Sequence, residues 1–172
     1  MSETLTKPRS KKPAAAVPRK RGQTSGKTAG GGFVSYCVHG PAGRSTAFSF
    51  TPSRLISALR VGLPVQELTD LQASLKVPME KLAPRLGISK ATLHRRKASG
   101  RLDPAESDRV MRFARLMGKA VEVLESDDHA RQWLTSPQFG LGGAVPLDYA
   151  DTEAGAREVE DLLGRIEHGV YS

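Results

Sequence analysis

The chain has 172 residues, of which 38% are hydrophobic and only 5% aromatic, a composition that suits small helical modules better than a β-sandwich or a large enzyme core. Its formal net charge of +8 favours a polyanionic partner such as nucleic acid. The single cysteine, Cys37, excludes an internal disulfide and a cysteine-based zinc site, and no apolar run is long enough to span a bilayer, so we expect a cytoplasmic protein without a membrane partner.

Residues 1–32 read as a basic tail, because eight Lys and Arg residues stand there against Glu3 alone. Leu5 and Val17 are its only large aliphatic residues beyond Met1, too few to offset the entropy of ordering, so we expect disorder. The run GQTSGKT at 22–28 has a glycine spacing one residue too short for a phosphate-binding loop. Residues 33–51 contain two β-like runs, FVSYCVH and STAFSF, and form either a weak hairpin or an unstructured linker.

From Pro52 onward the pattern becomes helical. A short helix is predicted over 54–61, and Gly62 ends it. A second helix begins at Pro64 and places four apolar residues on one face, at spacings of three and four. These residues are Val65, Leu68, Leu71 and Leu75. Pro78 then begins the first helix of the next motif.

Residues 82–97, LAPRLGISKATLHRRK, read as a helix, a tight turn and a second helix. Gly87 ends the first helix, because glycine adopts the left-handed conformation at no steric cost. Ser89 is a good N-cap for a second helix over 90–99. Leu93 is expected to point back at the first helix and close an apolar wedge. Pro84 lies within the first helix, which is therefore expected to be short or kinked.

This pattern is typical of a DNA-binding helix-turn-helix, whose second helix enters the major groove. An ordinary helical hairpin with a solvated basic face is the alternative. The eight basic residues within 76–101, opposed only by Glu80, favour DNA binding. Arg96 stands where such motifs often have an aliphatic residue. The residues expected to contact DNA are Ser89, Lys90, Ala91, Thr92, His94, Arg95, Arg96, Lys97 and Arg101.

A longer helix is predicted to begin at Asp103-Pro-Ala-Glu106, which reads as an N-cap, a first-turn proline and a capping-box glutamate. It runs to about Leu124, with an apolar face of Val110, Phe113, Met117, Val121 and Leu124. Asp127 and Asp128 are expected to cap a shorter helix, followed by a glycine-rich loop over 137–146 and a turn at 147–149. Thr152 caps a last helix over 153–168, which Gly169 ends; its apolar stripe is Ala156, Val159, Leu163 and Ile166, widened by Leu162.

Four short motifs near the C-terminus carry a family resemblance: Leu141-Gly-Gly143, Pro146-Leu-Asp148, Thr152–Arg157 and Ile166–Gly169. This region resembles the Xre/MbcA/ParS-type toxin-binding domain of antitoxins that are paired with RES-domain toxins, and the resemblance extends back to about residue 51. It implies an all-α fold with an N-terminal Xre-like helix-turn-helix domain over 52–115. A small helical toxin-binding and dimerisation domain is expected to follow over 116–172.

The resemblance also implies a function. The chain is expected to be an antitoxin that neutralises an NAD-consuming RES-domain toxin through its C-terminal region and, as a homodimer, represses its own operon. The residues expected to contact the toxin are Arg157, Arg165, His168, Gly169, Val170, Tyr171 and Ser172. The alternative is a stand-alone transcriptional regulator whose C-terminal half only dimerises. Neither a metal, a cofactor nor catalysis is expected, because the four histidines lack metal-ligand spacing and no nucleophile motif is present.

Overall fold

The computed structural model describes residues 52–170, and within them the secondary structure is helical, with no β-strand. The all-α prediction is therefore confirmed for this part of the chain. The expected tail at 1–32 and the hairpin or linker at 33–51 lie outside the described residues, as do Tyr171 and Ser172. The helices are α2 (Pro52–Val61), α3 (Val65–Leu75), α4 (Met79–Arg85), α5 (Lys90–Ser99), α6 (Pro104–Leu124), α7 (Asp127–Thr135), the 3-10 helix η1 (Phe139–Leu141), α8 (Pro146–Tyr149) and α9 (Glu153–Glu167).

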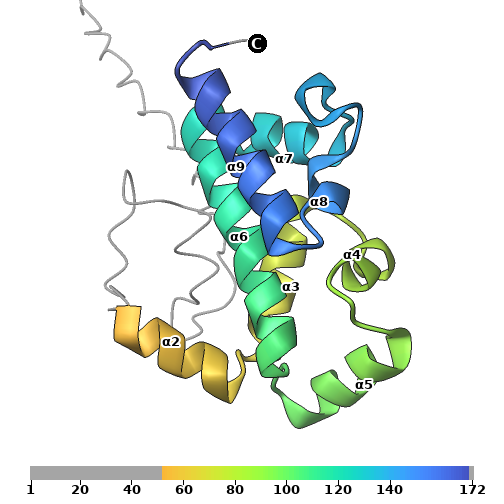
Figure 1. Cartoon of the computed structure of the whole chain (residues 1–172). Helices are drawn as coiled ribbons and strands as arrows, with labels where there is room; N and C mark the ends of the chain where they lie inside the picture. The colour runs from red at the N-terminus through yellow and green to blue at the C-terminus, as the bar shows by residue number, and fades with distance from the viewer. Residues whose placement is uncertain (1–51, 171–172) are drawn as a thin grey trace, which may run out of the picture.

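The long helix α6 lies at the centre of the molecule (Figure 1). Helices α2 and α3 pack against it on the helix-turn-helix side, and α7 and α9 pack against it on the C-terminal side. Phe113 and Leu116 of α6 are completely buried, so the two sides share one hydrophobic core. The other large side chains that are completely buried are Leu68, Leu71, Leu75, Leu82, Leu86, Ile88, Met117, Leu134, Leu147 and Leu163.

The start of α6 is fixed by the capping box that its sequence predicts. The Asp103 side chain accepts a hydrogen bond from the Ala105 N–H (3.0 Å), and the Glu106 carboxylate accepts one from the Asp103 N–H (2.8 Å). Pro104 fits the first helical position because its missing N–H would have had no helical partner there. The Ser107 hydroxyl, just inside the helix, accepts from the Leu63 N–H (2.8 Å) and so ties α6 to the segment between α2 and α3.

Helix α9 lies alongside α6 and buries the stripe that its sequence predicts. Ala156, Val159 and Leu163 are completely buried, whereas Ile166 is half-buried. Thr152 caps the helix as predicted, accepting from the Gly155 N–H (3.1 Å). A Cβ atom at Gly155 would lie 1.9 Å from the Tyr149 carbonyl oxygen, so only glycine allows α8 and α9 to approach this closely.

Three local expectations differ from the structure. Ser126, and not Asp127 or Asp128, is the N-cap of α7, and both aspartates lie in the first turn, where their charge still favours the helix dipole. The turn expected at 147–149 is the single-turn helix α8. The glycine-rich loop before it contains η1, which the glycine content of the sequence obscured. Within residues 52–170, none of the helices is long and apolar enough to cross a bilayer.

Ion pairs line one side of the contact between α6 and α9. Glu153 accepts hydrogen bonds from Arg112 Nε (3.1 Å) and Arg115 Nη2 (3.2 Å), and Lys119 Nζ lies 2.8 Å from a Glu167 oxygen. Partial burial raises the pKa of Glu153, but the hydrogen bonds and charges of Arg115 and Arg112 outweigh it and lower the pKa below its usual value. The hydrogen bond from Lys119 likewise lowers the pKa of Glu167.

These lowered pKa values predict acid sensitivity. A carboxylate whose folded-state pKa lies below its unfolded value stabilises the fold fully above the unfolded pKa, about 4.3 for Glu. That contribution is lost as the pH falls through the folded-state pKa. As the pH is lowered below about 4.5, the thermal unfolding midpoint should therefore decrease. The decrease should be less steep for Glu153→Gln. Asp161→Asn, at an exposed α9 position with no ion pair within 52–170, should follow the wild-type curve. Parallel curves for wild type and Glu153→Gln would contradict this assignment.

Candidate functional site

The turn between α4 and α5 is held by backbone hydrogen bonds and by one arginine from α6. Ile88 is buried, and its N–H donates to the Ala83 carbonyl (2.8 Å). Gly87 has φ +66°, as the sequence predicts for the residue that ends α4. Arg109 Nη1 donates to the Leu86 carbonyl (3.1 Å), and a Cβ atom at Gly87 would come within 2.8 Å of the same nitrogen. The geometry of this turn is thus fixed against the central helix.

Helix α5 begins and ends where the sequence predicts. The Ser89 side chain accepts from the Thr92 N–H (3.1 Å), and Gly100, with φ +75°, donates its N–H to the Arg96 carbonyl (2.8 Å). Although α5 is ten residues long, none of its residues is fully buried. Leu93 is half-buried and packs only against the edge of the core, so the expected apolar wedge is incompletely closed.

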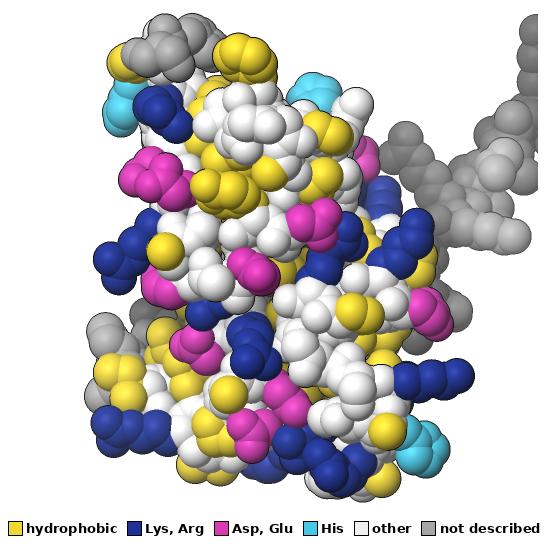
Figure 2. Space-filling model, turned by 45° about the vertical axis from the view of Figure 1, so that its right-hand side comes forward, with side chains coloured by type: hydrophobic (Ala, Val, Ile, Leu, Met, Phe, Trp, Pro, Cys, Tyr) yellow, Lys and Arg dark blue, Asp and Glu magenta, His cyan; other side chains and the backbone are white. Residues whose placement is uncertain are grey.

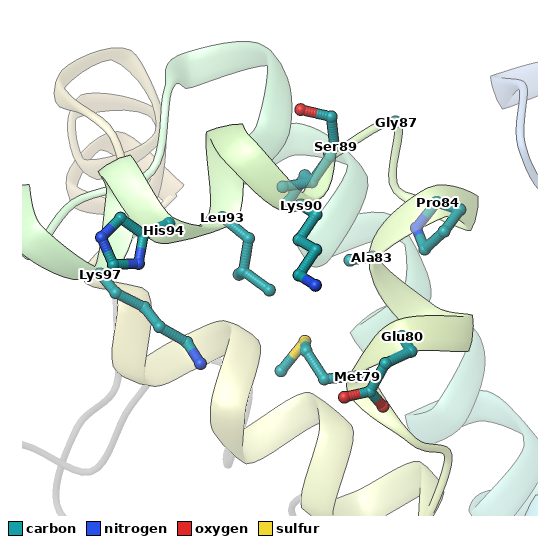
Figure 3. Close-up of a pocket in the computed structure, with 11 residues that line it drawn as sticks. Met79, Glu80, Ala83, Pro84, Gly87, Ser89, Lys90, Leu93, His94 and Lys97 are labelled. Atoms are coloured by element: carbon teal, nitrogen blue, oxygen red, sulfur yellow. The ribbon is translucent and has the colours of Figure 1, made fainter.

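A groove of about 740 Å³ lies in the angle between α4 and α5 (Figure 3). Met79, Ala83 and Leu93 give it an apolar floor, and Figure 3 shows Lys90 and Lys97 pointing into it from α5. The groove exists because α4 ends at Arg85, before the turn at Gly87, and α5 extends away from it. The concave side of the motif therefore combines an apolar surface with ammonium groups.

Arg96 joins α5 to the start of α6. Its Nε donates to Glu106 Oε2 (2.8 Å) and its Nη2 to Glu106 Oε1 (3.1 Å), and Asp103 lies 3.7 Å from Nη2. The hydrogen bond to Glu106 raises the pKa of the Arg96 guanidinium, against the opposing effect of desolvation. Arg96 was expected to contact DNA. It faces α6, and its Nε and Nη2 atoms are paired with Glu106.

The other residues expected to contact DNA divide between four positions. Successive helical residues are rotated by about 100°, so the face of α5 opposite Leu93 carries Ala91 and Arg95. Lys90, His94 and Lys97 line the groove. Ser89 and Thr92 cap the helix, and Arg101 Nη1 donates to the Gly62 carbonyl (2.9 Å). On the face drawn in Figure 2, Lys and Arg side chains gather at the lower end of the molecule, where Figure 1 places α5.

A second group of expected contact residues lies at the end of α9. His168 ends the helix, Gly169 has φ +66°, and Val170 is 53% exposed. Arg165 Nε is buried and has no hydrogen-bond partner within the described residues. A buried N–H without an acceptor costs free energy, so this donor is suited to an acceptor supplied by a partner. The fifth described residue of the group, Arg157, is exposed and lies 3.5 Å from Glu153.

One of the contacts between the helix-turn-helix part and the C-terminal part was missed by sequence reasoning. Arg85, at the end of α4, forms a two-pronged ion pair with Asp148 of α8, whose Oδ2 lies 3.2 Å from Arg85 Nη2. The two residues are 63 positions apart, and nothing local to either one signals the other. Within residues 52–170, no three His, Cys, Asp or Glu side chains are grouped as metal ligands.

Comparison with known proteins finds two family matches in this chain. Residues 54–115 match the family described as the antitoxin Xre-like helix-turn-helix domain, and residues 119–169 match the antitoxin Xre/MbcA/ParS C-terminal toxin-binding domain. "Antitoxin Xre" of Yersinia enterocolitica is 36% identical over 77% of this chain and 86% of its own length. "Antitoxin Xre" of Photorhabdus laumondii is also 36% identical, over 77% of this chain and 91% of its own length. "Prs ADP-ribosylating antitoxin" of Sphingobium is 26% identical, over 77% of this chain and 89% of its own length.

The position of Arg96 predicts that it orients α5 and does not contact a ligand. Because α5 buries no side chain fully, the Arg96–Glu106 pair is one of its few attachments to the rest of the protein. Arg96→Ala should lower the thermal unfolding midpoint and speed amide hydrogen exchange across residues 90–100. Arg95→Ala, one position away on the exposed face, is the matched control and should leave both unchanged. Equal exchange in the two variants would show that the pair does not hold α5.

Proposed function

The chain belongs to the Xre family of antitoxins, with a helix-turn-helix domain and a toxin-binding domain, and from this premise we propose that it neutralises a cognate NAD-consuming RES-domain toxin and represses its own operon. The toxin is bound through the C-terminal region, and double-stranded operator DNA is bound by a homodimer. The domains divide at about residue 115, into 52–115 and 116–172. The observation that carries the proposal is that the family match described as toxin-binding includes the whole of α9 and the exposed His168 and Gly169 at its end.

The proposal for the toxin has two supports. One is the Sphingobium relative, whose name attaches ADP-ribosylation of Prs to that antitoxin, and ADP-ribosylation is chemistry that uses NAD. The other is the chemistry at the end of α9. Arg165 and His168 supply donors suited to the carboxylates or phosphates of a nucleotide-binding cleft. The proposed contacts are Arg157, Arg165, His168, Gly169, Val170, Tyr171 and Ser172.

In the proposed repressor, the outward face of α5 lies in the major groove of the operator. Arg95 can donate two hydrogen bonds to a guanine, and the Ala91 methyl group can pack against a thymine methyl. Lys90, His94 and Lys97 project from the other side of α5, where they line the groove between α4 and α5, and their side chains can extend to phosphates beside the major groove. The N-terminus of α5, with Ser89 and Thr92, also favours a phosphate because its unpaired N–H groups carry partial positive charge.

The DNA proposal distinguishes base readers from phosphate binders. Arg95→Ala should weaken binding to the chain's own promoter by about 1–3 kcal/mol and reduce the preference over random duplex. Lys97→Ala should weaken binding to all sequences alike and flatten the salt dependence. Arg101→Ala should do the same, although it also removes the hydrogen bond to Gly62. Binding isotherms at several salt concentrations measure both effects. A wild-type protein that shows no preference for its promoter would overturn the repressor assignment.

The toxin proposal is tested by deleting residues 169–172. Val170 is exposed and Gly169 makes no contact that a Cβ atom would disturb, so the deletion should leave the fold and operator binding unchanged. Neutralisation should be lost or badly weakened. Co-expression with the product of an adjacent RES-domain reading frame, scored by growth and cellular NAD, measures it.

Two other outcomes of this experiment have clear meanings. If the deleted protein protects cells as well as the full chain does, the face of α9 blocks the toxin and its end does not. If the intact chain binds no such toxin, a stand-alone regulator whose C-terminal half only dimerises becomes the better interpretation.

A further inference from the structure

Phe139 is the most exposed large hydrophobic residue among residues 52–170: its side chain is 100% exposed. It lies in η1, within the loop that connects α7 to α8. A phenyl group held entirely in water forgoes the free energy that burial would give, and it contributes nothing to the core. The fully exposed phenyl group is therefore available to a partner without any change in the core.

The loop that carries Phe139 is tightly held. The Gln138 N–H donates to the Ala144 carbonyl (3.0 Å), and the Gly143 N–H donates to the Gln138 carbonyl (2.9 Å), so the two ends of the loop are closed on each other. Gln138 Nε2 also donates to the Trp133 carbonyl at the end of α7 (2.9 Å). Gly142 and Gly143, with φ of +65° and +86°, make this closure possible. The phenyl group is thus presented by a backbone that is already ordered, which lowers the entropy cost of binding.

The loop also rests on α9. A Cβ atom at Gly140 would lie 2.6 Å from Leu162 Cδ1, so the residue after Phe139 packs directly on that side chain. Leu162 and Ile166 are one helical turn apart and both are half-buried. They form an apolar strip that continues along α9 from the loop toward the end of the helix, and the exposed Val170 follows that end, beyond Gly169. Figure 1 shows the loop at the same end of the molecule as the C-terminal part of α9.

We propose that Phe139 is an anchor of the toxin interface, which inserts into an apolar recess on the surface of the toxin. The inference rests on the proposed function and extends it, because the anchor belongs to the loop after α7 and is separate from the contacts at the end of α9. Large aromatic side chains on a rigid support are the residues that dominate protein–protein binding energies. The toxin is thereby held at two points, the phenyl group and the end of α9.

The toxin, and not a second copy of the chain, is the occupant that the surroundings favour. Phe139, Leu162 and Ile166 all lie within residues 119–169, the part that matches a toxin-binding domain. On the outer side of α9, Glu158 and Asp161 are exposed and have no ion pair within the described residues. A second copy would bring the same acidic groups to this face, and like charges disfavour such a contact. The partner surface is instead expected to carry basic groups beside its apolar recess.

The test measures the affinity of the full-length chain for the product of the adjacent RES-domain reading frame. Phe139→Ala should weaken binding by about thirtyfold or more, the loss typical of an aromatic anchor. Phe139→Leu should retain a large part of the affinity, because an aliphatic side chain can still fill the recess. Val61→Ala, which truncates a 66% exposed residue of α2, is the matched control and should bind as wild type does. All three variants should keep the wild-type melting temperature, since neither Phe139 nor Val61 is buried.

Each other outcome overturns a distinct statement. Wild-type affinity in Phe139→Ala overturns the anchor and leaves the proposed function standing. A change in oligomeric state with unchanged toxin affinity assigns Phe139 to a contact between copies of the chain, which also overturns the anchor. If wild type itself does not bind the toxin, the proposed function fails and the anchor fails with it.

Discussion

The burial of α6 is the constraint on which the rest of the structure depends. Its buried face packs against α3 near the helix-turn-helix and against α7 and α9 in the C-terminal part, so residues from both halves complete one core around Phe113. The division proposed near residue 115 falls inside this continuous helix. A helix buried on both sides cannot bend at that point without exposing apolar side chains. The two proposed binding surfaces are therefore at opposite ends of one rigid element, and their relative orientation is set by the packing of α6.

Helix α5 is the exception to this apolar packing. It is attached by polar contacts, namely the Arg96–Glu106 pair and the hydrogen bond from the Val65 N–H to the Gly100 carbonyl (3.1 Å). Such contacts fix orientation well but each contributes little free energy when partly exposed. Held in this way, α5 keeps its outward face exposed, and these few contacts set the direction in which that face points. Glu106 is central to this arrangement, because the same carboxylate caps α6 and holds α5.

The features that could be predicted from the sequence are local ones. Asp103-Pro-Ala-Glu106, Ser89 and Thr152 cap helices through neighbours three residues or fewer away, and Gly87 and Gly100 act through their own backbone freedom. The contacts that were missed depend on tertiary structure. From the sequence alone Arg96 reads as a DNA contact, because its pairing with Glu106 depends on how α5 packs against α6. The pairing of Arg85 with Asp148 has no local sequence signal. The exposure of Phe139 was also hidden, because a phenylalanine in a glycine-rich run is equally compatible with a buried position.

The polar contacts between the two halves have a different role from the core. Lys76–Asp128 and Arg85–Asp148 connect α4 and the end of α3 to α7 and α8, and Arg131 Nη1 donates to the Ser74 carbonyl (3.3 Å). Both ion pairs include an aspartate that is more than half exposed, so water and salt screen them and they cannot be the main source of stability. These ion pairs matter more for the relative orientation of the helices that they join than for the free energy of folding. They select one rotational setting of α7 and α8 against the helix-turn-helix, and so fix the direction in which the Phe139 loop points relative to α5.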